Sequence, residues 1–265
     1  MLEKTGKITL LIVLIFASFA WGQKEEKQNR TITPEFTFTQ PRKLVDAPTA
    51  GLLPRGSFDF DIKIYPKGGV ITTLDIGITN RLMIALSFGG ENVIGEGEAN
   101  WNPDMEFAVK YRFLHESYAL PAFVLGYDGQ GYGAYDDSLK RYTYKSKGFY
   151  AVLSKNYLVA EVPVGLHGGI NYTLEKKDDK NADIFVGADV RFTQGWGIVL
   201  EYDLATNDDY SHSLYGQGYG YLNGGIQWIF SNRLLLEFDF KNMLKNRKGV
   251  TTLDREFRII FFEFF

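Results

Sequence analysis

Apolar and polar residues alternate along most of the chain from residue 56 onward. Phe58, Phe60, Ile62 and Ile64 are separated by charged residues, so that every second position is apolar. Successive side chains of a β-strand point to opposite sides, and this alternation therefore predicts a strand with one apolar and one polar face. The same period of two recurs in segments 107–113, 184–192, 198–204 and 234–240.

Counting all such segments predicts about twelve strands. They begin near residues 57, 69, 81, 104, 118, 147, 158, 182, 196, 218, 233 and 252. Many of them extend for about 9 to 11 residues, which is longer than the usual strand of a soluble protein. A tilted strand needs about that length to cross a lipid bilayer.

The connections between these segments alternate between short and long. Short links are expected at 79–80, 115–117, 155–156, 193–195 and 231–232, and longer polar links at 89–104, 128–147, 175–181 and 205–217. Short turns at one end and longer loops at the other are typical of outer-membrane barrels. We therefore predict an all-β fold, an antiparallel up-and-down transmembrane β-barrel of about 12 strands.

The composition helps to decide which face of the strands is outside. The chain has 265 residues, of which 45% are hydrophobic, and 21 Phe and 16 Tyr are among them. Twelve strands enclose a wide interior, and wide barrels have polar lumens, so we expect the apolar face to point outward. Aromatic residues near both ends of the strands fit the two interfaces of a membrane. A soluble sandwich or a lipocalin-like barrel remains the alternative.

The first part of the chain differs from the rest. Lys4 and Lys7 precede an apolar run at 8–20, and small residues lie three and one positions before a cleavage site after Gly22, so residues 1–22 are predicted to be a signal peptide. An uncleaved anchor helix is the alternative. Residues 23–55 are predicted to form an irregular periplasmic leader, because they are polar and interrupted by prolines. Residues 56–265 are then the barrel.

The end of the chain resembles that of bacterial outer-membrane β-barrel proteins, in which the last strand carries alternating apolar residues and a terminal Phe. Glu263 departs from that pattern. The resemblance implies an outer-membrane location, with barrel-assembly machinery, membrane lipid and lipopolysaccharide as partners. The residues of the implied assembly signal are Phe257, Ile259, Phe261 and Phe265.

A narrower resemblance is carried by Ala47-Pro-Thr-Ala-Gly51, by the strand that begins at Gly56, and by Gly77-Ile-Thr-Asn-Arg-Leu82. These motifs look like those of YjbH-type, exopolysaccharide-associated barrels. That similarity implies a role near surface polysaccharide and names no activity.

The polar face supplies the candidate lumen. It is mildly acidic, and its candidate residues are Asp59, Asp61, Lys63, Asp75, Glu106, Lys110, Arg112, Glu161, His167, Asp189, Arg191, Glu201, Asp203, Glu237, Asp239, Lys241, Glu256 and Arg258. An acidic lumen predicts a passive, cation-preferring channel or a barrel associated with secretion or export. The alternative is a non-conducting structural or surface-interaction barrel, closed by salt bridges.

The sequence offers little for catalysis or for a cofactor. Cysteine is absent, and 29 basic residues against 32 acidic ones leave no basic field for nucleic acid. We predict no cofactor and no enzyme, with a rim hydrolase around His212 as the minor alternative. We predict no metal site, although three acidic pairs in outward loops are weak candidates for Ca²⁺ or Mg²⁺. These pairs are Asp136 and Asp137, Asp178 and Asp179, and Asp208 and Asp209.

Overall fold

β-Strands account for nearly all the regular structure of the described residues. The computed structural model describes residues 40–175, 177–192, 195–209, 215–231 and 233–265. The predicted signal peptide, most of the leader and His212 lie outside these residues. In the part of the chain that the structure describes, no helix is long and apolar enough to cross a membrane.

The strands are β1 (Ser57–Tyr65), β2 (Gly69–Gly77), β3 (Leu82–Glu91), β4 (Asn100–Trp101), β5 (Glu106–Leu114), β6 (Ala122–Asp128), β7 (Tyr132–Asp136), β8 (Arg141–Tyr144), β9 (Gly148–Val159), β10 (Val162–Tyr172), β11 (Asp183–Arg191), β12 (Trp196–Asp203), β13 (Tyr221–Ser231), β14 (Leu234–Lys241) and β15 (Asp254–Phe264).

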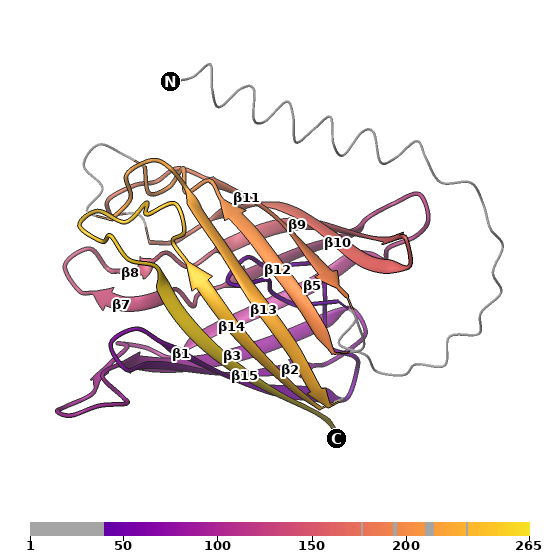
Figure 1. Cartoon of the computed structure of the whole chain (residues 1–265), viewed down its shortest axis with the longest axis horizontal. Coiled ribbons are helices and arrows are strands. Elements are labelled where there is room, and N and C mark those ends of the chain that lie inside the picture. The colour runs from indigo at the N-terminus through magenta and orange to yellow at the C-terminus, as the bar shows by residue number, and fades with distance from the viewer. Residues whose placement is uncertain (1–39, 176, 193–194, 210–214, 232) are drawn as a thin grey trace, which may run out of the picture. The chain divides into compact units, whose positions relative to one another are not determined.

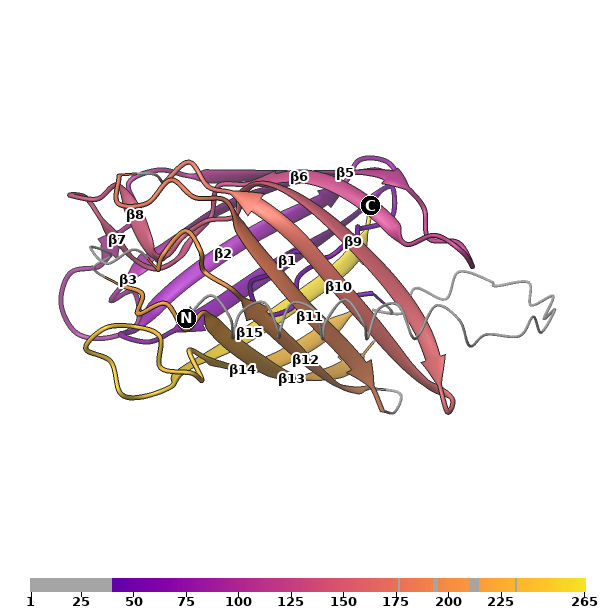
Figure 2. The ribbon, with the colours of Figure 1, turned by 90° about the horizontal axis from the view of Figure 1, so that it is seen from above.

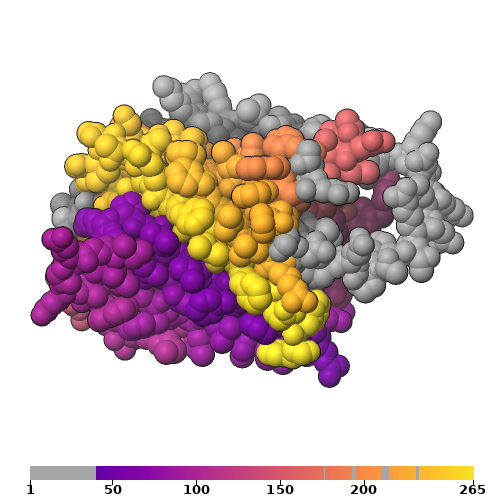
Figure 3. All heavy atoms as spheres, turned by 60° about the horizontal axis from the view of Figure 1, so that its bottom comes forward, coloured from indigo at the N-terminus to yellow at the C-terminus, as the bar shows by residue number. Residues whose placement is uncertain are grey.

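Twelve of these strands form one closed antiparallel barrel. Neighbours in the chain pair with one another from β1 to β3, and then through β5, β6 and β9 to β15. The barrel closes where β15 pairs with β1, with Phe264 opposite Ser57. In Figure 3 the yellow end of the chain accordingly lies against the indigo strands. The predicted fold, an antiparallel up-and-down barrel of about 12 strands, is confirmed.

The two ends of the barrel differ as the spacing predicted. Figures 1 and 2 show the long connections at the left end, where β7 and β8 form a separate hairpin. Strand β4 also lies at this end and pairs with β3 alone. The last strand finishes at the opposite end, where the connections are mostly short. We call the left end the outer end and the right end the inner end.

Burial alternates along most strands of the barrel and assigns the two faces. In β12, the apolar side chains of Trp196, Ile198 and Leu200 are exposed, whereas Glu201 is buried. In β1, Asp59 is fully buried while its neighbour Phe60 is exposed. The apolar face therefore points outward and the ionic face inward, as expected for a barrel whose solvent is lipid.

One turn differs from its prediction. The link between β9 and β10 is not at Lys155 and Asn156 but at Ala160 and Glu161, whose φ angles are +48° and +67°. Lys155 stays in β9 because its Nζ binds the carbonyl oxygen of Tyr118 at 3.0 Å, and Glu116 accepts the backbone N–H of Asn156 at 2.8 Å. These bonds to the β5–β6 loop lengthen β9 beyond the polar pair that suggested a turn.

The shift of this turn corrects one predicted lumen residue. Glu161 lies in the turn itself and is exposed, so it does not line the lumen. The two prolines that interrupt the strand pattern lie where a missing N–H costs little: Pro121 precedes β6, and Pro163 is the second residue of β10, next to the turn.

Candidate functional site: the occupied lumen

Charged residues of several barrel strands are buried on the face opposite the exposed apolar one. Apart from Glu161, every residue predicted to line the lumen is buried or half-buried in the structure. They include Asp59 and Lys241, whose exposed fractions are both 0%. Charged groups this deeply buried need partners, because an isolated ion in a protein interior is costly.

Many of these partners come from a segment that is not part of the wall. Residues 40–55, which we call the plug, form no strand and run inside the barrel. Leu44, Val45 and Ala50 of the plug are completely buried. Ala47 and Ala50 pack against wall residues of β6, β9 and β11, namely Ala122, Val124, Tyr150, Val152 and Phe185. The lumen therefore holds a segment of the chain itself.

Asp46 joins the plug to two strands on one side of the lumen. Its carboxylate lies 2.8 Å from the Nζ of Lys63 on β1 and 2.5 Å from the Nζ of Lys241 on β14. Glu256 on β15 lies 3.2 Å and 3.3 Å from the same two ammonium groups. Burial raises the pKa of the Asp46 carboxyl, but Lys241 and Lys63 lower it by more, so its pKa lies below the usual value.

Glu201 of β12 holds the backbone of the plug beside Asp46. One of its carboxylate oxygens accepts the N–H of Asp46 at 2.9 Å and that of Ala47 at 2.7 Å. The other oxygen accepts the side-chain amide of Asn223 at 2.8 Å. Bonds of this kind are stronger than bonds between neutral groups when the acceptor is ionised.

Two basic side chains of β5 bind carbonyl groups of the plug on either side of Asp46 in the sequence. The Nζ of Lys110 donates to the carbonyl oxygens of Arg42 at 2.5 Å and of Thr49 at 3.3 Å. Arg112 donates from Nε and Nη2 to the carbonyl oxygen of Ala50, at 3.2 Å and 2.6 Å. These bonds satisfy carbonyl groups that an irregular buried segment would otherwise leave unpaired.

Two basic side chains of the plug add ion pairs to wall acids. Arg42 pairs with Asp59, and Lys43 lies 2.7 Å from Asp128 at the end of β6. Asp46, Arg42, Lys43 and Asp128 were not among the predicted lumen residues. No periodicity connects the plug to the wall, so the strand pattern gives no signal for these four residues.

His167 lies in a hydrogen-bonded row on the wall. Its Nδ1 is 2.8 Å from the Oγ of Ser154, and its Nε2 is 2.8 Å from Oδ1 of Asp189. The same Oγ accepts the backbone N–H of Ala50 at 2.8 Å. His167 was predicted to line the lumen, and its two partners come from β9 and β11, while the plug contacts the row through Ser154.

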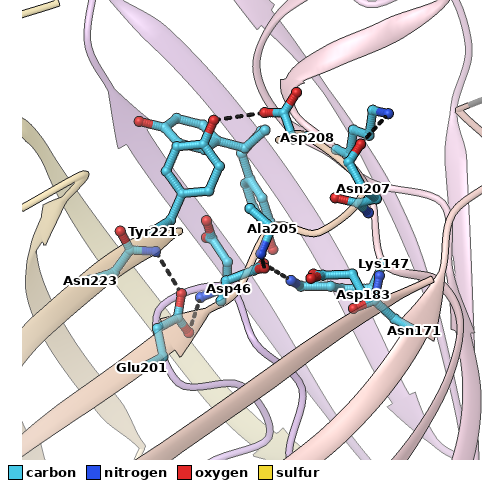
Figure 4. A pocket seen from close by; sticks show the side chains of 14 residues that line it. Asp46, Lys147, Asn171, Asp183, Glu201, Ala205, Asn207, Asp208, Tyr221 and Asn223 are labelled. Carbon is cyan, nitrogen blue, oxygen red and sulfur yellow. Dashed lines mark hydrogen bonds and ion pairs between the residues drawn. The ribbon is translucent and has the colours of Figure 1, made fainter. Parts of the chain in front are cut away.

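A small polar pocket lies between the plug and the outer loops. Figure 4 shows Asp46 and Glu201 at one side of it, and Tyr221, whose hydroxyl donates to Asp208 at 2.7 Å, at another. Lys147 on the same wall pairs with Asp203. The buried amide of Asn171 also lines the pocket, and within the described residues it has no hydrogen-bond partner. Water is the simplest occupant of a polar pocket of this kind.

The outer loops are tied together above this pocket by buried ions. Arg141 of β8 binds Asp178, and its Nη1 lies 2.7 Å from Asp208. Lys145 lies 2.8 Å from Asp178. Burial raises the pKa of the Asp178 carboxyl, but Lys145 and Arg141 together lower it by more, so its pKa lies below the usual value.

The three acidic pairs are therefore used largely within the protein. Asp136 accepts hydrogen bonds from Ser138 and from the N–H of Leu139, which lower its pKa to about 2. Asp137 and Asp209 are exposed, and Asp179 is buried. Among the described residues, no group of three or more His, Cys, Asp or Glu side chains is placed to hold a metal ion.

Other sequence candidates lie apart from the lumen. His115 is exposed in the β5–β6 loop, and His212 lies outside the described residues. The residues of the implied assembly signal lie in or next to β15, where Phe261 and Phe265 are exposed, and Phe265 stacks on Phe58 with ring centroids 5.4 Å apart.

Comparisons with known proteins give structural neighbours. No protein-family model matches the sequence, and no curated protein matches it significantly. A structure described as the KdgM porin is similar, with 9% identity and a TM-score of 0.48 over 79% of this chain and 99% of that one. The NanC porin gives 13% and 0.42 over 78% and 99%. The outer membrane protein Omp33 of Acinetobacter baumannii gives 8% and 0.46 over 81% and 100%. At these similarities, the function has to follow from the residues of this chain.

Proposed function

We propose that this protein is an outer-membrane channel with an acidic, cation-preferring lumen, held closed by its own N-terminal segment. The observation that carries the proposal is the occupied lumen. Side chains of the wall bind the plug, and the plug pairs with no strand of the sheet. Because no strand pairing depends on it, the plug can leave without opening the barrel wall.

The outer surface supports a membrane location. Large apolar side chains are exposed at mid-strand, such as Leu86, Leu153 and Leu200 with exposed fractions of 51%, 48% and 47%. Trp196 and Trp228 stack near the inner end, with ring centroids 5.5 Å apart. A belt of aliphatic residues bordered by aromatic ones matches the surface that a bilayer stabilises.

The lumen supports a channel over a solid barrel. Its wall carries ions where a solid core would carry aliphatic residues, so water fills it readily when the plug leaves. Acids outnumber bases on this wall, and the plug supplies two of the cations, Arg42 and Lys43. Departure of the plug therefore makes the lumen more acidic, which favours cations.

Conductance in planar bilayers tests the proposal. The full chain is compared with Asp46→Lys, which places a third cation against Lys63 and Lys241 and should expel the plug. We expect the wild type to be mostly closed and the variant to conduct, with a reversal potential that shows cation preference. Asp137→Lys makes the same charge change on an exposed loop residue and should behave as the wild type.

Two results would overturn the proposal. A wild type that conducts as freely as Asp46→Lys would show that the plug does not close the lumen, and anion preference would contradict the acidic wall. The second candidate function, a non-conducting surface-interaction barrel, is favoured by the buried ion cluster that joins the outer loops at Arg141. That candidate would be selected if neither the wild type nor Asp46→Lys conducts, although protease cleavage within residues 40–55 shows that the plug of the variant is released.

A further inference from the structure

The row formed by Ser154, His167 and Asp189 has the geometry of a catalytic triad. The three side chains come from the adjacent strands β9, β10 and β11, and both hydrogen bonds measure 2.8 Å. All three are almost completely buried. A triad is recognised by geometry and roles, and not by the order of its residues in the chain.

A glycine on β10, the strand that carries His167, permits this arrangement. Gly165 of β10 lies opposite Asp189 in the β10–β11 register. A Cβ at this position would lie 2.1 Å from Oδ1 of Asp189 and 2.9 Å from Nε2 of His167. Any larger residue would therefore push the carboxylate and the imidazole apart.

For the neutral form of His167, the hydrogen bonds assign the proton positions. A carboxylate only accepts, so Asp189 takes the hydrogen bond from Nε2–H of this form. Nδ1 is then an acceptor for the hydroxyl of Ser154. This is the order needed for a base that removes a proton from a serine nucleophile while a carboxylate orients the base.

The plug shows what fits beside Ser154. The N–H of Ala50 donates to the Ser154 Oγ, and the carbonyl group of the same residue receives two hydrogen bonds from Arg112. The Ala50 side chain packs in a cluster with Val124 and Val152. Ala50 therefore contacts a hydroxyl group, a guanidinium group that binds its carbonyl oxygen, and a small apolar surface at the same time.

We propose that Ser154, His167 and Asp189 form an acyl-transfer site that hydrolyses esters of short apolar carboxylic acids, and that the plug masks this site. Departure of the plug, on which the activity depends, rests on the proposed function above. The acyl group would take the place of the Ala50 side chain, and its carbonyl oxygen would bind Arg112.

The reaction balances with water as the second reactant. The Ser154 hydroxyl proton moves to His167 Nδ1 as Oγ bonds to the carbonyl carbon, and Arg112 stabilises the resulting oxyanion. The C–O bond to the alcohol then breaks, and the alcohol leaves with that proton. Water attacks the acyl-serine by the same route and releases the carboxylic acid and free Ser154.

The plug contacts Ser154 through the Thr49–Ala50 peptide group. The Ser154 Oγ accepts the N–H of Ala50, so it lies near the plane of that peptide group. Attack on the carbonyl carbon of Thr49 requires approach from above that plane, and this peptide bond is therefore held in an unreactive orientation.

Labelling by a fluorophosphonate probe tests the site in the full-length protein. We expect Asp46→Lys to be labelled at Ser154 at least about tenfold faster than the wild type, since labelling follows the fraction of unplugged molecules. Ser154→Ala in that background should abolish labelling. Ser87→Ala, which removes another buried serine of the barrel, should not change it.

Ester hydrolysis and its pH dependence distinguish a catalytic Ser154 from a serine that is labelled only because it has become exposed. Asp46→Lys should hydrolyse p-nitrophenyl butyrate faster than p-nitrophenyl palmitate, and Asp189→Asn should lower kcat and alter the pH profile while the barrel still assembles. Absence of labelling at Ser154 in both Asp46→Lys and Glu201→Gln overturns the proposal. A variant that conducts without labelling refutes the acyl-transfer site alone, whereas labelling without conductance refutes the channel alone.

Discussion

The contact between Glu201 and the plug gives a quantitative test of closure. Glu201→Gln keeps the size of the side chain and removes its charge. In the structure, one oxygen of Glu201 accepts the N–H groups of Asp46 and Ala47, at 2.9 Å and 2.7 Å. The amide that replaces the carboxylate keeps one acceptor oxygen but loses the charge that strengthens both bonds.

The expected magnitude follows from these two bonds. Hydrogen bonds to charged groups contribute about 1.5–3 kcal/mol each, against about 1 kcal/mol for neutral pairs. Loss of charge assistance at both N–H groups should therefore weaken the closed state by about 2 kcal/mol, which raises the ratio of open to closed molecules about thirtyfold.

Single-channel recording measures this ratio directly, as the fraction of time that each protein conducts. Glu237→Gln is the matched control, because Glu237 is also a buried wall acid but its partners are Gln227 and Arg258 and not the plug. An equal rise in both variants would show that lumen charge, and not the contact with the plug, sets opening. No rise in Glu201→Gln would refute the assignment of these two bonds to closure.

Three further predictions concern the outer surface and the loops. Leu200→Arg places a charge on the lipid-facing side of β12 and should disfavour insertion by about 2–4 kcal/mol, measured by folding into lipid vesicles. Arg141→Met removes the buried cation that binds both Asp178 and Asp208, so the outer loops should open and become sensitive to limited proteolysis. The pKa of Asp136 is lowered to about 2, chiefly by its hydrogen bond from Ser138, so the stabilisation of the β7–β8 turn should be complete above about pH 4 and lost as the pH falls through about 2. Amide exchange at 136–139 across that range would detect the change, and pH-independent exchange would contradict it.

Alternation predicted the strands well because it acts on every residue of a barrel wall. In β1 and β12, a shift of the strand pairing by one residue would turn the charged side chains toward lipid, so the alternation permits only one pairing register. The turn between β9 and β10 was placed wrongly for a local reason. Lys155 and Asn156 resemble turn residues, but distant bonds to the β5–β6 loop keep them in the strand.

The position of the plug could not be predicted in the same way. Its backbone has no period, because side chains from distant strands satisfy its polar groups. Asp46 is separated by 155 residues from Glu201, which binds its N–H, and Ser154 is 104 residues from the Ala50 N–H that it accepts. No short-range pattern in the sequence reports such pairs.

The nature of the bonds that hold the plug bears on whether it can leave. Bringing two ions out of water costs free energy that their attraction only roughly recovers, so a buried ion pair such as Asp46 with Lys241 adds little net stability. It is nevertheless specific, since either partner is costly when left alone inside the barrel. In an open lumen, water would reach both partners and that penalty would largely disappear. The ion pairs of the plug therefore place it well in the closed state at little cost to its departure, whereas its buried apolar side chains, such as Leu44 and Val45, lose their stabilisation on exposure to water.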